Sequence, residues 1–134
     1  MVGYSGTPLA QRLGFKPGHR AALRDAPPGF ARTLGALPEG VAFVGAAAKR
    51  IDLALFFAVS QGALRKSFAR EAARLTPAGM LWIAWPKQAA KVATDLTETV
   101  VREVGLAAGL VDVKVCAINE TWSGLKFVRR LKDR

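Results

Sequence analysis

The stretch IDLALFFAV, residues 51–59, decides the fold. Its residues are apolar except for Asp52, so an extended chain presents apolar side chains on both of its faces. A strand that is buried on both faces is typical of a parallel sheet covered by helices on its two sides. We therefore predict that this stretch is a central strand of such a sheet.

A helix is predicted directly after this strand, over residues 61–75. Leu64, Phe68 and Ala72 recur at intervals of four residues, which places them on one face of a helix. Residues 76–79, Thr-Pro-Ala-Gly, are predicted to be the turn that ends this helix. A second buried strand is predicted over residues 80–85.

The remaining elements alternate between strands and helices on either side of this unit. Asp95 and Glu98 form the Asp-x-x-Glu pattern of a helix start. Further strands are predicted over residues 20–24, 41–44, 111–118 and 125–131, and further helices over residues 8–13, 30–37 and 95–105.

This order of elements predicts one domain of the α/β class, over residues 1–134. The predicted architecture is a Rossmann-like three-layer sandwich with a six-stranded, mostly parallel sheet, and residues 41–44 form one edge of that sheet. Only residues 119–124 join the last two strands, whereas a parallel crossover needs about a dozen residues or more. The last strand is therefore predicted to be antiparallel and to close a C-terminal hairpin.

The composition is strongly basic: 20 Lys and Arg against 10 Asp and Glu give a formal net charge of +10. Such a surplus attracts polyanions, which makes nucleic acid a candidate partner, although a basic surface also serves solubility alone. No apolar run reaches the roughly 18 residues of a membrane helix, and no signal peptide is recognised. With one cysteine no internal disulfide can form, so we expect a cytoplasmic protein without a membrane partner.

The carboxyl ends of the predicted parallel strands carry the most distinctive polar and aromatic side chains. Open α/β sheets bind ligands at this edge, where the strand order reverses. Two indoles beside an ammonium suit an anion with a flat group. The alternative is that loops at this edge simply need turn-forming residues. We predict a site for a small anionic or nucleotide-like ligand formed by Asp25, Ser60, Trp85, Lys87, Trp122 and Ser123.

The first strand-to-helix turn argues against dinucleotide binding in the usual manner. It lacks the Gly-x-Gly-x-x-Gly pattern, and Pro27 and Pro28 remove two backbone N–H groups that such a turn directs at a phosphate. His19 is predicted in a turn at the opposite edge and Cys116 inside an apolar strand, so neither has a predicted catalytic role. The sequence has no cluster of Cys and His for a metal.

Lys66, Arg70 and Arg74 follow one another at intervals of four residues in the helix predicted over residues 61–75. Like charges at this spacing destabilise a helix by about a few tenths of a kcal/mol per pair, which favours an anionic partner such as nucleic acid on this face. The alternative is an ordinary solvated face, on which Glu71 relieves part of the repulsion.

Residues 51–57, the helix that follows them and the segment LTPAGMLW, residues 75–82, resemble the middle of a class I methyltransferase. In that family an aspartate-led strand and a helix are followed by a Leu-x-Pro-x-Gly turn into the next strand. The resemblance implies the same sheet with a C-terminal antiparallel hairpin. The family's glycine-rich S-adenosylmethionine loop is replaced here by Ala-Pro-Pro-Gly at residues 26–29, so no cofactor is predicted.

Four short motifs resemble a family of short bacterial proteins, the domain of unknown function 3052. The motifs are GYSGTPL at residues 3–9, WPK at residues 85–87, TDL at residues 94–96 and TWSGLK at residues 121–126. The resemblance spans nearly the whole chain. It implies no activity, because the family is uncharacterised, and no catalytic residue follows from it.

The function predicted from these observations is non-catalytic binding of a small anionic or nucleotide-like ligand, or of a partner, at the carboxyl edge of the sheet. An enzyme is not favoured, because no paired carboxylates, nucleophile with a base or metal cluster is recognised. The two alternatives are a degenerate methyltransferase-like transferase and a basic nucleic-acid-associated protein.

Overall fold

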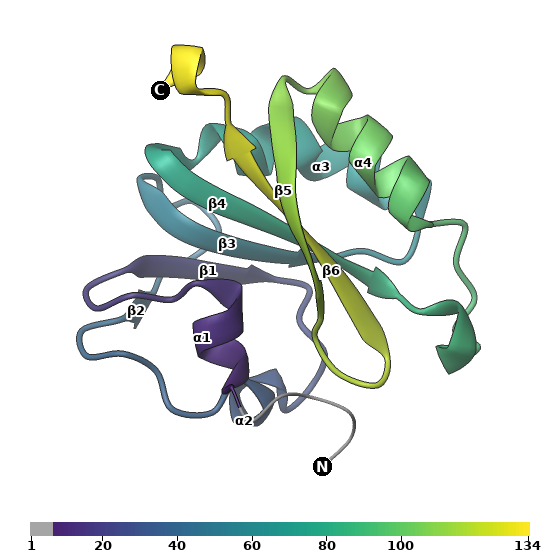
Figure 1. Cartoon of the computed structure of the whole chain (residues 1–134), viewed down its shortest axis with the longest axis horizontal. Helices are drawn as coiled ribbons and strands as arrows, with labels where there is room; N and C mark the ends of the chain where they lie inside the picture. Colours follow the sequence, from purple (N-terminus) through teal and green to yellow (C-terminus); the bar gives the residue numbers. More distant parts are fainter. Residues whose placement is uncertain (1–6) are drawn as a thin grey trace.

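A mixed sheet with the strand order β2-β1-β3-β4-β6-β5 lies at the centre of the computed structural model, which describes residues 7–134 (Figure 1). Residues 3–6 of the GYSGTPL motif lie outside the described residues. The strands are β1 (Arg20–Arg24), β2 (Ala42–Phe43), β3 (Ile51–Phe57), β4 (Leu75–Pro86), β5 (Leu110–Ala117) and β6 (Trp122–Arg129). The helices are α1 (Leu9–Leu13), α2 (Phe30–Leu34), α3 (Gln61–Ala73) and α4 (Glu98–Ala107), with short 3-10 helices η1 (Gln88–Ala90) and η2 (Leu131–Asp133).

The strand directions follow the prediction. β1 is parallel to β2 and β3, and β3 is parallel to β4. β6 lies between β4 and β5 and is antiparallel to both, so β5 runs parallel to β4. The α/β class, the edge position of β2 and the antiparallel last strand are therefore confirmed. The carboxyl ends of β1, β3, β4 and β5 share one edge of the sheet, and β6 begins there.

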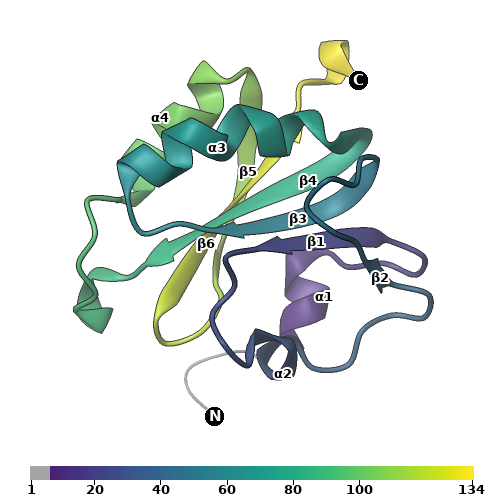
Figure 2. The same cartoon turned by 180° about the vertical axis from the view of Figure 1, so that it is seen from behind.

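Helices lie on both faces of the sheet, which gives the predicted three layers (Figures 1 and 2). On the face of α3 and α4, one apolar core includes Phe56 and Phe68. On the face of α1 and α2, the second core includes Leu55 and Trp82. The side chains of β3 alternate between the two cores, and this alternation explains why residues 53–57 are all apolar.

The predicted turn at residues 76–79 is wrong, because these residues belong to β4. Ile51 of β3 pairs with Leu75 of β4, and Leu53 pairs with Met80. Between these two pairs β3 has one residue and β4 has four, so the extra residues of β4 form a bulge. A Cβ on Gly79 would lie 2.7 Å from the carbonyl oxygen of Ile51, so glycine is required at this close approach. Helix α3 already ends at Ala73, before the Thr-Pro-Ala-Gly sequence.

The predicted helix start at Asp95 is also wrong, since α4 begins at Glu98 with Thr97 as its cap. The Thr97 hydroxyl accepts a hydrogen bond from the amide of Val100 at 3.2 Å. The Asp95 carboxylate instead accepts from the amide of Gln61, the first residue of α3, at 2.8 Å. A carboxylate at the positive end of α3 is stabilised there although it comes from a distant part of the sequence.

Other boundaries differ from the predicted ones by one to three residues, and three of them have a clear local context. α1 begins one residue later than predicted, after the cap residue Pro8. α2 stops at Leu34 because Gly35 adopts φ 75° and ψ −152°, which is outside helical space. β6 begins at Trp122, so the hairpin loop between β5 and β6 is shorter than predicted.

Candidate functional site

The sheet edge at the carboxyl ends of β1, β3, β4 and β5 is where the sequence predicts the ligand site. The structure brings three of the six predicted residues, Trp85, Lys87 and Ser123, to one hollow at this edge. The other three lie outside the hollow and are described below.

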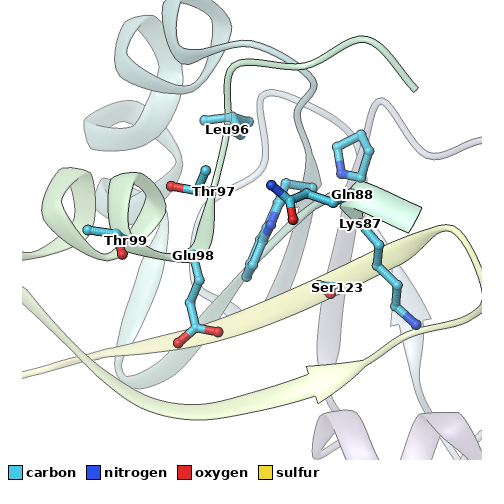
Figure 3. A pocket seen from close by; sticks show the side chains of 9 residues that line it. Lys87, Gln88, Leu96, Thr97, Glu98, Thr99 and Ser123 are labelled. Carbon is cyan, nitrogen blue, oxygen red and sulfur yellow. The ribbon is translucent and has the colours of Figure 1, made fainter. Parts of the chain in front are cut away.

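This hollow, which we call the rim hollow, has a volume of about 370 Å³ and lies between the end of β4, the start of β6 and the first turn of α4 (Figure 3). Lys87 and Gln88 are on one side of it, and the first turn of α4 is on the other. This volume is in the range of small-molecule sites. The lining residues are Trp85, Pro86, Lys87, Gln88, Leu96, Thr97, Glu98, Thr99 and Ser123.

Trp85 and Ser123 share the rim hollow because they are paired across β4 and β6. Directly opposed residues of an antiparallel ladder point to the same face of the sheet. Trp85 is only 5% exposed and belongs to the core beneath α3 and α4, so its indole is an inner wall. The amide of Lys87 donates to the carbonyl of Thr121 at 2.8 Å, which extends the ladder and fixes the backbone that carries the Lys87 side chain.

The charges on the two sides of the rim hollow differ. Lys87 is half-buried and forms no ion pair with any residue that the structure describes. Glu98 is paired with Arg102 at 2.8 Å, and Nε of the same guanidinium donates to Asp112 at 2.8 Å. The hydrogen bond from Arg102 holds the pKa of Asp112 below its ordinary value. An unpaired ammonium opposite a compensated carboxylate favours an anionic ligand.

The first turn of α4 adds backbone donors to the rim hollow. The first four amides of a helix have no acceptor within the preceding turn, except where the cap residue supplies one. The Thr97 hydroxyl accepts from Val100, and the Thr97 carbonyl accepts from Val101 at 3.0 Å. The amides of Glu98 and Thr99 are left over, at the positive end of the helix dipole, and both residues line the hollow.

Trp122 does not lie beside Trp85 and Lys87 as the sequence analysis predicts. It pairs with Pro86 and directly precedes Ser123 in β6, so its side chain points to the opposite face of the sheet. Nearness to the same strand end is therefore not enough to place two side chains in one site.

On its own face Trp122 belongs to an aromatic row. Its ring meets Phe57 edge-on with the centroids 5.0 Å apart, and Phe57 meets Phe30 in the same way at 4.9 Å. Phe57 ends β3 and Phe30 begins α2, and both are buried. The row fills the edge beside β1 and β3 on the α2 side, where the strand order reverses and open α/β sheets commonly bind ligands.

Ser60 and Asp25 serve local structure and do not line the rim hollow. The Ser60 hydroxyl caps α3 by accepting a hydrogen bond from the amide of Ala63 at 3.1 Å. Asp25 adopts φ 56°, has a side chain that is 71% exposed, and lies 3.7 Å from the guanidinium of Arg24.

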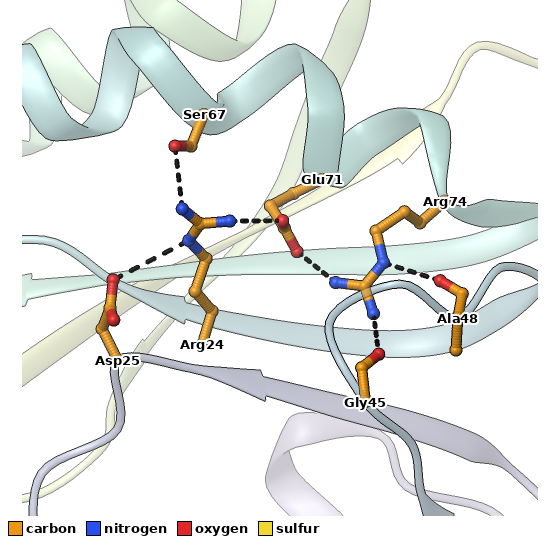
Figure 4. A network of polar contacts seen from close by, with 7 residues as sticks. All are labelled: Arg24, Asp25, Gly45, Ala48, Ser67, Glu71 and Arg74. Carbon is orange, nitrogen blue, oxygen red and sulfur yellow. Dashed lines mark hydrogen bonds and ion pairs between the residues drawn. The ribbon is translucent and has the colours of Figure 1, made fainter.

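The predicted basic stripe on α3 is broken at Arg74. Lys66 and Arg70 are exposed, but Arg74 is buried and its Nη1 donates to the carboxylate of Glu71 at 2.6 Å (Figure 4). Its other nitrogens donate to backbone carbonyls of the loop before β3, at 2.7 and 2.8 Å. Arg74 is the C-terminal cap of α3, where the chain turns back into the sheet, so the four-residue spacing does not keep it on the solvent face.

The α4 side of the rim hollow is not predicted from the sequence. Thr97, Glu98 and Thr99 reach it because α4 begins after Asp95 rather than at it. The available signal is Thr97 itself, since threonine is a preferred cap and a valine-rich helical segment follows it.

The cysteine and the histidine take no part in this site. Cys116 is buried, and its sulfur accepts a hydrogen bond from Arg12 at 3.2 Å. His19 accepts through Nδ1 from the amide of Lys16 in the turn before β1. Within residues 7–134, no three His, Cys, Asp or Glu side chains are placed to hold a metal ion, and no helix has the length and apolar character to cross a membrane.

Several methyltransferases are among the solved structures that are similar to this chain. The 1,6-didemethyltoxoflavin-N1-methyltransferase of Burkholderia thailandensis, solved with S-adenosylhomocysteine, is 18% identical with a TM-score of 0.58, and the match covers 90% of this chain and 74% of that one. The precorrin-6y C5,15-methyltransferase of Geobacter metallireducens is 12% identical with a TM-score of 0.63, covering 91% and 86%. The magnesium protoporphyrin IX methyltransferase of Synechocystis PCC 6803, solved with S-adenosylmethionine, is 12% identical with a TM-score of 0.62, covering 91% and 74%.

The fold is methyltransferase-like. At these identities the likeness concerns the fold alone, and it confirms the predicted Rossmann-like sheet with an antiparallel C-terminal hairpin. No family model matches the chain, and no curated protein matches its sequence. Membership of the family of short bacterial proteins therefore stays a prediction.

Proposed function

We propose that this domain binds a small anionic ligand in the rim hollow and catalyses no reaction there. The observation that carries the proposal is the position of Lys87, which lines a hollow of about 370 Å³ and whose ammonium has no ion-pair partner among residues 7–134. The lining has one carboxylate and no histidine or cysteine, so it offers no acid–base pair and no thiol nucleophile.

An anionic group fits between Lys87 and the first turn of α4. The ammonium supplies a full charge and three donors, and the amides of Glu98 and Thr99 supply two more at the positive end of a helix. The hydroxyl of Ser123 and the amide of Gln88 are left for uncharged parts of the ligand. The ligand class is therefore a small carboxylate or phosphate with further polar groups.

Glu98 is the group in the lining that opposes an anion. Arg102 compensates its charge at 2.8 Å, but both side chains are partly exposed, so the compensation is incomplete. Replacing Glu98 with Gln should therefore strengthen the binding of an anion, whereas replacing Lys87 with Ala should weaken it. Opposite effects from two residues of one hollow would locate the ligand there.

The test is a thermal-shift screen of small carboxylates, phosphates and nucleotides against the protein. A ligand at about 100 times its Kd stabilises the fold by about 2.7 kcal/mol, which is readily measured. We expect an anionic compound that shifts the melting temperature of the protein but not that of Lys87→Ala. The matched control is Lys132→Ala, which removes one exposed charge outside the hollow. If no anionic compound shifts the protein, or if both variants lose the shift equally, the proposal fails.

The comparisons favour a second candidate, an S-adenosylmethionine-dependent methyltransferase. They support it more directly than they support a non-catalytic domain, because similar structures include enzymes solved with S-adenosylmethionine or S-adenosylhomocysteine. Two observations oppose it: Pro27 and Pro28 supply no backbone donors after β1, and Phe30, Phe57 and Trp122 fill the edge beside β1 and β3. Calorimetric titration with both compounds separates the candidates, and saturable micromolar binding would favour the methyltransferase over the non-catalytic domain.

Three of the motifs that resemble the family of short bacterial proteins contribute residues to the same hollow. Residues 85–87 and 94–96 contribute Trp85, Lys87 and Leu96 to the rim hollow, and residues 121–126 contribute Ser123. Three motifs that are distant in sequence therefore meet at the same hollow. We propose on this basis that the chain belongs to that family and that the rim hollow is the feature its motifs encode.

A further inference from the structure

Among residues 7–134, no helix covers one face of the sheet over part of β5 and β6. In Figure 1, α1 and α2 lie on the β1 side of this face, and none of the helices formed by residues 7–134 lies in front of β5 and β6. Figure 2 shows that α3 and α4 lie on the opposite face. The β4 side chains Trp82 and Ala84 on this face are buried. We therefore call only the part of the face around Lys114 of β5 and Lys126 of β6 the open sheet face.

The strand register identifies the side chains of the open sheet face. Trp82 of β4 belongs to the core on the α1 side, and it pairs with Lys126 of β6. Lys126 pairs in turn with Lys114 of β5. Paired residues share a face, so both lysines point to the open sheet face. The next ladder positions on one side of this pair are half-buried and apolar: Met80, Val128 and Val111. On the other side the next positions are buried: Ala84, Gly124 and Cys116.

Three lysines repel one another on this face. Lys114 and Lys126 are direct cross-strand neighbours, a placement in which like charges destabilise a sheet. Lys16 lies three residues after Leu13, whose carbonyl accepts a hydrogen bond from the indole of Trp82 at 2.8 Å, so its backbone comes close to the Trp82–Lys126 pair. Burial lowers the pKa of Lys126, and the charges of Lys114 and Lys16 lower it further. None of them forms an ion pair within the part of the chain that the structure describes, and the Lys114 ammonium donates to the carbonyl of Arg12 at 3.0 Å.

We propose that the open sheet face binds the phosphate backbone of a nucleic acid through Lys16, Lys114 and Lys126. A row of phosphates replaces the repulsion among the lysines with attraction. This surface is separate from the rim hollow, because none of the three lysines lines that hollow. It also differs from the stripe on α3, which the burial of Arg74 interrupts.

The shape of the surface favours a polymeric anion over a small one. The lysines come from two strands and a turn and lie on an open face, so a single small anion would be solvated and would contact only part of the cluster. A DNA duplex carries one negative charge per about 1.7 Å of its axis and can meet all three. The apolar neighbours are half-buried within the sheet and do not project as anchors into a bilayer. Contacts to phosphates alone carry no sequence information, so binding should be independent of base sequence.

The experiment measures the Kd for a short labelled DNA duplex of mixed sequence between about 50 and 200 mM salt. The test variant carries Lys16→Gln, Lys114→Gln and Lys126→Gln. The matched control carries Lys66→Gln, Arg70→Gln and Lys132→Gln, so that both variants have the same net charge. Circular dichroism establishes that each variant is folded. Lys114→Gln alone, at an exposed position, replaces the triple variant if that variant does not fold.

We expect the test variant to lose DNA affinity and salt dependence, and the control variant to keep most of both. Each lost phosphate contact should reduce the slope of log Kd against log salt by about 0.9, so the test variant should lose about 2–3 from the slope and bind at least about tenfold more weakly. Lys114→Gln alone should lose about 0.9. The control should keep most of the slope. Equal losses in both triple variants, no duplex binding at low salt, or binding to phosphatidylserine vesicles without duplex binding would each overturn the proposal.

Discussion

Glu71 and Arg74 form an ion pair one turn apart at the end of α3, with 2.6 Å between the charged atoms and only 2% and 8% of the two side chains exposed. The same carboxylate accepts a hydrogen bond from Arg24, the last residue of β1, at 2.9 Å (Figure 4). Arg74 also holds the loop before β3 through two backbone carbonyls. A single carboxylate therefore ties α3 to the sheet and to a loop.

Replacing Glu71 with Gln should lower the free energy of unfolding by about 3–5 kcal/mol, because Arg74 is left buried without its counter-charge. The control is Glu98→Gln, which removes a carboxylate from a partly exposed i, i+4 pair with Arg102 and should cost less than about 1 kcal/mol. Urea denaturation of both variants measures the two values. Similar costs for the two variants would show that the buried network does not hold α3 in place.

Gly105 in α4 touches the ring of Phe127 so closely that a Cβ would overlap it. That ring is fully buried and meets Phe68 edge-on at 5.4 Å, so it has no room to move away. Gly105→Ala should therefore destabilise the fold by about 1–3 kcal/mol or more, as overpacking does. Gly62→Ala in α3 is the control: nothing lies within 4 Å of its Cβ, and the substitution should stabilise by up to about 1 kcal/mol. Thermal denaturation of the pair should give changes of opposite sign.

Asp95 and Thr97 cap different helices although they are two residues apart. Asp95→Ala should weaken α3 and Thr97→Ala should weaken α4, each by about 0.5–2 kcal/mol. Hydrogen exchange measured residue by residue separates the two effects, with faster exchange at Gln61 in the first variant and at Val100 in the second. Faster exchange at Val100 in Asp95→Ala would instead indicate that Asp95 caps α4, as the sequence pattern predicts.

The fold is predictable from the sequence where a run of neighbouring residues shows by its apolar pattern that a segment is buried. The apolar run over residues 51–57 identifies β3 because both of its faces are covered, and the short link to β6 fixes the antiparallel direction. The bulge at Gly79 and the role of Asp95 are not predictable in this way. Each depends on a contact with a residue far along the chain, the carbonyl of Ile51 and the amide of Gln61, and neither contact leaves a periodic pattern.

The candidate site is predictable only in part for a related reason. The parallel topology brings Trp85 and Lys87 to the same edge as Ser123, and the order of elements is enough to show this. The face to which each side chain points depends on register, and a shift of one residue reverses it. Trp122 is therefore at the predicted edge but on the other face of the sheet from Trp85.

The rim hollow and the aromatic row predict opposite behaviour for Lys87 and Trp122. Lys87→Ala should change the free energy of unfolding by less than about 0.5 kcal/mol, since the ammonium has no ion pair to lose. It should nevertheless raise the Kd of the anion found in the thermal screen by about tenfold or more, because that anion loses its full counter-charge. Trp122→Ala should remove the ring that packs on Phe57 and cost about 3 kcal/mol, while the Kd of the folded variant at low temperature stays the same. Isothermal titration and urea denaturation of both variants give the four values. A loss of affinity in Trp122→Ala equal to that in Lys87→Ala would place the ligand across the end of the sheet, in contact with both faces, and not in the rim hollow.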